Sequence, residues 1–84
     1  MKRINFSKHA CENMGYRGTT EAEVAETIQT APWTPGKLGR IECRKDFAYG
    51  RDWNGRFYAT KQVRPIFVEE ADHILVVTVY VYYF

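Results

Sequence analysis

The chain has 84 residues, of which 45% are hydrophobic, 26% charged and 15% aromatic. This composition predicts one globular domain over residues 1–84 and excludes both a disordered tail and a chain with room for a second domain. The longest apolar run, residues 74–84, is too short to cross a bilayer, which takes about 20 residues. Two cysteines are too few for a disulfide framework, so we expect reduced thiols in a cytoplasmic protein that does not enter a membrane.

The formal net charge of +2 conceals an uneven distribution along the chain. Residues 1–36 are neutral overall, whereas residues 65–84 carry three acidic side chains and no basic one. Residues 37–64 carry eight basic and three acidic side chains, a net charge of +5. Because clustered positive charge attracts anions, we expect any anionic partner to bind this middle third.

The first third of the chain predicts two helices. Ser7 is a suitable N-cap for a helix that Gly15 and Gly18 end. Thr20 and Glu23 have the spacing of a capping box, in which each side chain binds the backbone amide of the other residue. This capping box begins a second helix, which ends at Pro32 because proline cannot continue it.

The remainder of the chain predicts strands after a loop at residues 32–39. The strands are expected at residues 40–49, 56–63, 66–69 and 73–84, with a hairpin turn at Asn54-Gly55 and a bend at Pro65. We therefore expect an α+β fold, with two N-terminal helices packed on one face of a four-stranded, mostly antiparallel sheet.

The last predicted strand has two chemically different faces. Strict alternation puts nearly all of the aliphatic side chains on one face, namely Leu75, Val77, Val79, Val81 and Tyr83. The other face carries Ile74, Val76, Thr78, Tyr80, Tyr82 and Phe84. We expect the helices to cover the aliphatic face and the threonine and tyrosine face to stay open.

His9 is the first candidate for a chemical role. It lies in the first turn of the first predicted helix, with Asn13 one turn on and Tyr16 and Arg17 beyond it on the same flank. An imidazole beside a guanidinium suits acid–base chemistry on a phosphodiester. The alternative is a histidine that is exposed or bound to a backbone carbonyl.

The basic middle of the chain is the second candidate. Its cations alternate with aromatic residues and are Arg40, Arg44, Lys45, Arg51, Arg56, Lys61 and Arg64. Cations for phosphates and rings for unpaired bases are what the recognition of single-stranded RNA requires. The alternative is that the charges are solvated and the rings belong to the core.

Two weaker features complete the set of candidates. The hydroxyls of Thr78, Tyr80 and Tyr82 suit either phosphate binding or a plain exposed strand. His73 lies near three acidic residues, but their spacing matches no metal-ligand pattern, so we expect no metal site. The chain contains no glycine-rich nucleotide motif and no serine nucleophile motif, so we expect no cofactor.

Residues near the start of the chain share their spacing with a known family. They are Ser7, His9, Ala10, Met14, Arg17, Gly18, Thr20, Glu23 and Val24. Their pattern, S-x-H-A-x-x-x-M-x-x-R-G-[IT]-[ST]-x-x-[ED]-V, resembles that of a bacterial and phage domain family of uncharacterised function. Residues 43–47 and 76–80 resemble two of its strands. That family is similar to RelE- and BrnT-like ribonuclease toxins, which pack helices on an antiparallel sheet and cut RNA without metal.

The resemblance implies a toxin-like, metal-independent endoribonuclease or RNA-binding protein with His9, Arg17 and Tyr80 as catalytic residues. The ribose 2′-hydroxyl would attack the adjacent phosphate, with His9 as general base or acid and Tyr80 as orienting group or donor. Arg17, with Arg44 or Lys45, would stabilise the developing charge. The expected RNA-binding residues are Arg40, Arg44, Lys45, Lys61, Arg64 and Thr78.

Partners and alternatives follow from the same features. The resemblance implies an acidic, antitoxin-like protein that covers the basic sheet. A second hypothesis is a non-catalytic module that binds nucleic acid or protein, with His9 in a structural role. A third is a homodimer through the aromatic C-terminal strand, because exposed strand edges pair readily.

Overall fold

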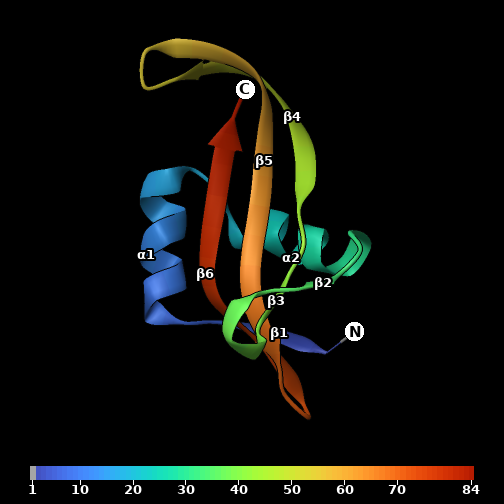
Figure 1. Ribbon diagram of the computed structural model, residues 1–84. Coiled ribbons are helices and arrows are strands. Elements are labelled where there is room, and N and C mark those ends of the chain that lie inside the picture. Colours follow the sequence, from blue (N-terminus) through green and yellow to red (C-terminus); the bar gives the residue numbers. More distant parts are fainter. Residues whose placement is uncertain (1) are drawn as a thin grey trace.

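The computed structural model describes residues 2–84, which fold into helices on one side of a sheet (Figure 1). In chain order the elements are β1 (Arg3–Phe6), α1 (Lys8–Arg17), α2 (Glu21–Thr30), β2 (Thr34–Pro35), η1 (Lys37–Gly39), β3 (Ile41–Glu42), β4 (Lys45–Trp53), β5 (Arg56–Glu69) and β6 (His73–Tyr83). Within residues 2–84, neither α-helix has the length and apolar character needed to cross a membrane.

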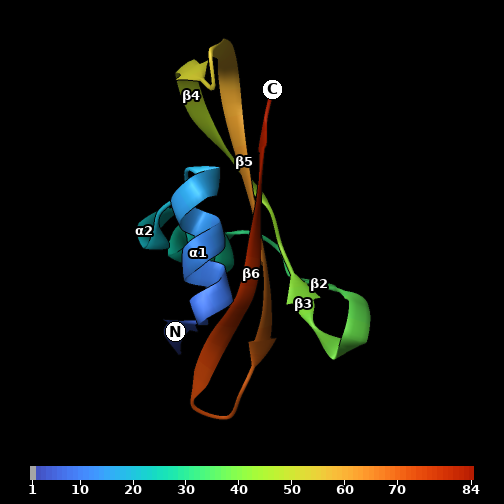
Figure 2. The ribbon, with the colours of Figure 1, turned by 90° about the vertical axis from the view of Figure 1, so that its left-hand side faces the viewer.

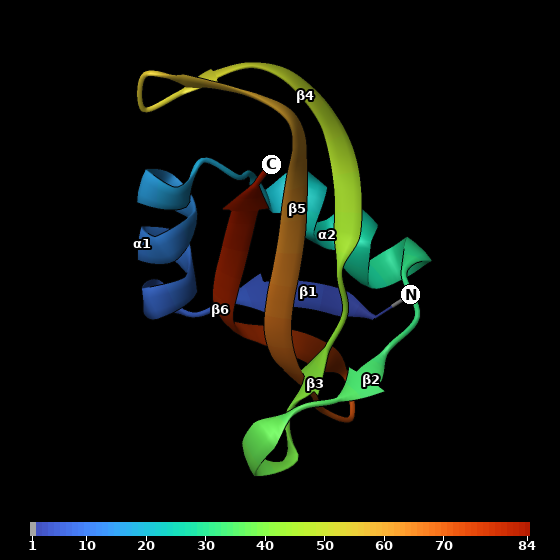
Figure 3. The same cartoon turned by 45° about the horizontal axis from the view of Figure 1, so that its top comes forward.

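The sheet has six strands and is mixed, so the predicted four-stranded, mostly antiparallel sheet is wrong. Its strand order is β1-β6-β5-β3-β2, and β4 pairs with the other end of β5. β1 runs parallel to β6, with Arg3 beside His73, whereas the other pairs are antiparallel (Figure 3). β1 is missed because its four residues are too few for a clear alternation, and its partner lies at the other end of the chain.

Pro65 does not bend the chain as predicted, because β5 continues through it from Arg56 to Glu69. The pairing of β4 with β5 ends at Val63, and the pairing of β3 with β5 begins at Ile66. Pro65 therefore lies where neither strand pairs with β5, and its missing amide leaves no broken hydrogen bond there.

Both helices begin where predicted and α2 ends before Pro32, because these signals are local, whereas α1 continues through Gly15 and ends only at Gly18. The Ser7 hydroxyl accepts a hydrogen bond from the Ala10 amide, and Gly18 ends α1 in a left-handed conformation with φ 82°. At α2 both hydrogen bonds of the predicted capping box are formed between Thr20 and Glu23. These caps fix where each helix starts against the sheet.

A register shift in β6 changes which of its side chains face the helices. Phe67 pairs with Val76 and Ile66 pairs with Thr78, so Val77 is an extra residue in β6. On the N-terminal side of this bulge, Ile74 and Val76 are buried in the core, although strict alternation places them on the open face. On the C-terminal side of the bulge, the predicted alternation is correct: Val79 is buried, and Thr78, Tyr80 and Tyr82 belong to the open face.

Helix α1 covers the edge of β6 that β1 leaves unpaired (Figure 2). The Ser7 hydroxyl donates to the Val77 carbonyl at 3.0 Å, and Nη1 of Arg17 donates to the Val79 carbonyl at 2.7 Å. Carbonyls of an edge strand that would otherwise be unpaired are therefore satisfied by side chains of α1. Figure 2 also shows that α1 and α2 lie on one face of the sheet, whereas the loop that carries η1 projects on the other side, from the edge formed by β3 and β2.

The tip of the β4–β5 hairpin bends over the end of α1 (Figures 1 and 3) and closes the helix side of the sheet with aromatic rings. The Trp53 ring stacks on the Tyr83 ring with centroids 4.8 Å apart. The Tyr83 hydroxyl donates to the Arg17 carbonyl at 2.7 Å, and burial, followed by nearby negative charge, raises the pKa of Tyr83 to about 12. Gly18 lies directly against this cluster.

Replacing Gly18 with alanine is therefore expected to destabilise the fold. A Cβ atom at this position would lie 2.5 Å from the Tyr83 hydroxyl and 2.7 Å from the Trp53 ring, and the left-handed backbone adds strain. We expect Gly18→Ala to lower the free energy of unfolding by roughly 2–4 kcal/mol in urea denaturation.

Gly15→Ala is the matched control, because Gly15 lies inside α1 and a Cβ atom added there would meet nothing within 4 Å apart from its chain neighbours and the nearby backbone of its own helix. We expect this variant to be more stable than the wild type by about 1 kcal/mol, since alanine favours a helix. Equal stability of the two variants would contradict a close packing of Gly18 on Tyr83.

Candidate functional site

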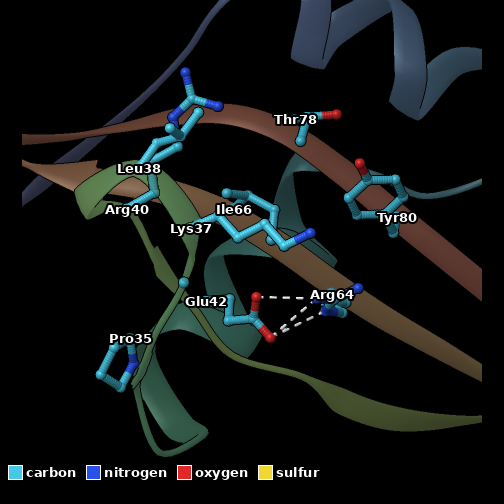
Figure 4. A pocket seen from close by; sticks show the side chains of 10 residues that line it. Pro35, Lys37, Leu38, Arg40, Glu42, Arg64, Ile66, Thr78 and Tyr80 are labelled. Carbon is cyan, nitrogen blue, oxygen red and sulfur yellow. Dashed lines mark hydrogen bonds and ion pairs between the residues drawn. The ribbon is translucent and has the colours of Figure 1, made fainter.

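A groove lies on the face of the sheet that the helices leave open, between β5, β6 and the loop that carries η1 (Figure 4). Its volume is about 660 Å³. The strands contribute Glu42, Arg64, Ile66, Thr78 and Tyr80, and the loop contributes Lys37, Leu38 and Arg40. The groove therefore combines three basic side chains with one carboxylate and several apolar or hydroxyl-bearing groups.

Arg64 and Glu42 form a two-pronged ion pair at one end of the groove. Nη2 of Arg64 lies 2.9 Å from Oε2 of Glu42, and Nε lies 3.2 Å from Oε1. The hydrogen bonds and positive charge of Arg64 lower the pKa of Glu42, so this carboxyl is ionised at neutral pH. Arg44 adds a looser contact of 3.7 Å to the same carboxylate.

Tyr80 lies between two guanidinium groups. The Arg17 guanidinium is 5.2 Å from the centre of the Tyr80 ring and the Arg64 guanidinium is 5.5 Å from it, both within the range of a cation–π contact. Arg17 reaches Tyr80 from α1 across the edge of β6, where its Nη1 also binds the Val79 carbonyl. The structure thus brings two of the three predicted catalytic residues together.

A row of exposed aromatic side chains continues from the groove along β6. Tyr80, Tyr82 and Phe84 alternate with core-facing residues and are 39%, 42% and 58% exposed. The Tyr82 hydroxyl accepts a hydrogen bond from Nη1 of Arg64 at 3.1 Å, which positions that ring beside the cation. These rings present apolar faces to solvent next to positive charge.

Thr78 connects the groove to α1 by hydrogen bonds. Its hydroxyl donates to Oδ1 of Asn13, and Nδ2 of Asn13 lies 3.1 Å from the Tyr16 hydroxyl. Asn13 is buried, so this contact fixes α1 against β6. Thr78 lies on the open face as predicted and lines the groove, but its hydroxyl already donates its proton to Asn13.

Lys61 is a predicted RNA-binding residue that lies on the wrong face of the sheet. Its side chain points to the helices and is only 5% exposed. Nζ donates to Oε1 of Glu23 at 2.9 Å and to the Gly18 carbonyl at 3.0 Å. Burial acts to raise the pKa of Glu23. Hydrogen bonds from Lys61 and Thr19 outweigh this effect, so the pKa of Glu23 lies below its ordinary value. Lys61 is a structural residue.

Two further predicted RNA-binding residues lie outside the groove. Lys45 pairs with Val63, a core residue, and its Nζ is 3.8 Å from the Glu26 carboxylate on α2, on the helix side. Arg44 is exposed and leans towards Glu42 but does not line the groove. The other three predicted RNA-binding residues, Arg40, Arg64 and Thr78, do line the groove.

His9 does not join the other candidate residues. It is exposed in the first turn of α1, and within residues 2–84 it makes no side-chain hydrogen bond or ion pair. It does not line the groove. The structure therefore places Arg17 and Tyr80 together without His9.

Sequence reasoning missed six residues that line the groove, namely Pro35, Gly36, Lys37, Leu38, Glu42 and Ile66. Glu42 faces the groove because β3 pairs with β5, which sets Glu42 opposite Ile66 and diagonal to Arg64. Lys37 and Leu38 belong to a loop whose composition predicts no contact with the sheet. The glycines on either side of them, Gly36 and Gly39, were the one signal of a tight turn there.

Within residues 2–84, neither the two thiols nor the potential metal ligands form a second site. Cys11 is exposed and Cys43 is buried, and neither forms a disulfide. Burial, followed by the charge of Glu42, raises the pKa of Cys43 to about 11, which makes this thiol a poor nucleophile. Over the described part of the chain, no group of three or more potential ligand residues is placed to hold a metal ion.

Comparison with models of protein families, with curated proteins and with solved structures finds no match to this chain. The resemblance to the toxin-like family therefore stays a prediction, and its functional consequences are proposals.

The buried position of Lys61 predicts that this residue stabilises the fold and does not bind RNA, and a substitution can distinguish these two roles. We expect Lys61→Gln to lower the free energy of unfolding by about 2–4 kcal/mol, because it removes the positive charge that pairs with the Glu23 carboxylate and the long side chain that donates to the Gly18 carbonyl. Its RNA affinity, measured where the variant is still folded, should stay within about twofold of that of the wild type.

Lys45→Gln is the control, because its contact with Glu26 is long and partly exposed. This variant should change stability by no more than about 0.5 kcal/mol. A stable Lys61→Gln variant with weakened RNA binding would mean that Lys61 reaches RNA after all.

Proposed function

We propose that this protein binds single-stranded RNA on the open face of its sheet. The observation that carries the proposal is the row of Tyr80, Tyr82 and Phe84 beside Arg64 on the face away from the helices. Unpaired bases stack on exposed rings, and cations beside the rings bind the phosphates between the bases. Successive side chains on one face of a strand are about 7 Å apart, a spacing that a single strand of RNA can follow.

The distribution of charge supports the same ligand. Lys37 and Arg40 line the groove, and neither makes an ion pair with any carboxylate among residues 2–84. Arg64 is partly neutralised by Glu42 but still faces the groove. The open face thus keeps a net positive charge next to apolar rings, which favours a nucleic acid over a neutral ligand.

Removing two rings tests the proposal directly. We expect the double variant Tyr82→Ala, Phe84→Ala to bind a fluorescent single-stranded RNA oligomer at least about tenfold more weakly than the wild type, because each stacked base contributes about 1–3 kcal/mol. Fluorescence anisotropy measures the dissociation constants, and the wild-type affinity should fall as salt is raised.

Two controls isolate the rings. Tyr82→Phe loses only the hydroxyl that Arg64 contacts and should retain wild-type affinity within about twofold. Phe57→Ala removes a ring that is 60% exposed in the β4–β5 hairpin, away from the groove, and should bind normally. The proposal fails if the double variant binds as well as the wild type, or if Phe57→Ala loses as much affinity.

A second candidate function is metal-independent cleavage of that RNA. It is favoured by the contact between Arg17 and Tyr80, which sets a cation and a phenol side by side at the edge of the groove. In this reaction the ribose 2′-hydroxyl attacks the adjacent phosphate, the bond to the 5′-oxygen breaks, and a 2′,3′-cyclic phosphate forms. Tyr80 would give its proton to the departing 5′-oxygen, and Arg17 would stabilise the charge on the phosphate.

His9 would have to accept the 2′-hydroxyl proton from outside the groove, and its position tests the catalytic version. If the protein is an endoribonuclease, we expect it to cut total RNA in EDTA and His9→Ala to lose at least about a hundredfold in rate. Gel electrophoresis of the products measures both. Lys8→Ala, a neighbouring exposed residue, is the control. Binding without cleavage by the folded, partner-free wild type would leave the non-catalytic module as the function.

The proposed partners follow from the same surface. An acidic protein of antitoxin type would meet Lys37, Arg40 and Arg64 on the open face and compete with RNA for it. A homodimer through β6 could use only part of the edge of this strand, because side chains of α1 already bind the carbonyls of Val77 and Val79. A second copy would have to pair with the part of β6 beyond them.

A further inference from the structure

The loop between β2 and β3 is a tight hairpin that stands over the groove. The Gly36 amide donates to the Arg40 carbonyl at 2.7 Å, and the Arg40 amide donates to the Lys37 carbonyl at 3.1 Å. Pairing of Pro35 with Ile41 holds the base of the loop. These contacts give the loop a defined shape, with Leu38 at its tip.

Leu38 has an unusual conformation for its residue type. Its φ is 59° and its ψ is 34°, which is the left-handed region that side chains with a Cβ atom disfavour. Its side chain is 86% exposed, so no burial in the protein compensates for the strain. Non-glycine residues held in such conformations cluster at active sites, ligand clamps and switch regions. The strain and the exposure of Leu38 are therefore two observations that point to the groove beside it.

The side chains around Leu38 define the chemistry of a ligand. Figure 4 shows the Lys37 chain extending over Ile66 on β5, with its nitrogen above the groove. Leu38 and Ile66 provide apolar surfaces from the loop and from the sheet, and Lys37 and Arg40 provide two cations that carry no ion pair within the described residues. A planar apolar group joined to a phosphate matches this combination, and a volume near 660 Å³ lies in the usual range for small-ligand sites of about 300–1,000 Å³.

We propose that the groove is a nucleotide subsite, in which Leu38 and Ile66 enclose a base and Lys37 and Arg40 bind its phosphate. The subsite rests on the proposed function, since it would hold one nucleotide of the RNA strand whose neighbours stack along β6. Within the subsite Arg64 is not needed as a phosphate ligand, because its Nε and Nη2 already bind the Glu42 carboxylate and its Nη1 lies beside the Tyr82 ring, where it can serve the neighbouring nucleotides. An acidic peptide could use the same cations, but it would leave the apolar surfaces of Leu38 and Ile66 without a partner.

The test uses uridine 5′-monophosphate, uridine and inorganic phosphate as separate probes of the full-length, ¹⁵N-labelled protein. We expect uridine 5′-monophosphate to shift the backbone amide signals of residues 36–40, and to bind more tightly than uridine or phosphate alone. The double variant Lys37→Gln, Arg40→Gln should raise its dissociation constant by about tenfold or more and change uridine binding by less than about twofold. Arg3→Gln, an exposed cation on β1, is the control.

Leu38→Gly provides a second, independent readout. Glycine adopts the left-handed region without strain, so the thermal midpoint should equal or exceed that of the wild type. Loss of the apolar surface should nevertheless raise the dissociation constants for uridine 5′-monophosphate and for uridine by about fivefold or more. A merely structural role for Leu38 does not predict a variant that is as stable and binds more weakly.

Several outcomes would overturn the subsite. They are unshifted loop amides with uridine 5′-monophosphate, phosphate binding as tight as nucleotide binding, and loop shifts with a glutamate-rich peptide but not with the nucleotide. If the groove variants bind single-stranded RNA like the wild type while the ring variants of β6 do not, the subsite is wrong and the RNA surface stands. If the wild type binds the nucleotide but no RNA, the proposed function is wrong and the subsite stands alone.

Discussion

The contact between Lys61 and Glu23 is the interaction on which the arrangement of this molecule depends. It joins the start of α2, the end of α1 and the middle of β5, because Lys61 donates to Glu23 and to the Gly18 carbonyl while Glu23 also accepts from Thr19 and Thr20. A buried ammonium group that lost these acceptors would be strongly unfavourable, so the pleat of β5 is held in one orientation. With Lys61 facing the helices, Gln62, Arg64 and Ile66 must face the other way. The groove exists because this charge is buried on the opposite side.

Arg17 shows how structural and chemical demands meet in one side chain. Its guanidinium satisfies a carbonyl at the edge of β6 and lies over the Tyr80 ring, so it closes the sheet edge and contributes charge near the groove. A phosphate that approached Arg17 would compete with the Val79 carbonyl for one of its five donors. The remaining donors of the guanidinium can serve a ligand without opening the edge.

The elements that the sequence predicted correctly are those whose signals are local. The caps at Ser7, Gly18 and Thr20 lie within one helical turn of the groups they bind, so the helices followed from a few residues each. The parallel pairing of β1 and the bulge at Val77 depend on partners far along the chain, and no local pattern encodes them. The same contrast between local and distant signals explains which residues of the candidate site were predicted. Thr78 and Tyr80 were found because alternation along the last strand fixes their face. Arg64 and Lys61 were both chosen from a count of charges, which carries no direction, so one lies in the groove and the other is buried under the helices.

The place of β1 in the sheet has a consequence for how the chain is made. β1 is the first of these strands to leave the ribosome, yet its neighbour in the sheet is β6, which is the last. The sheet therefore cannot be completed until β6 has been synthesised, and the apolar face of α1, which packs on β6, stays uncovered until then. Contacts between distant parts of a chain form slowly, so the pairing of β1 with β6 is expected to be a late step of folding.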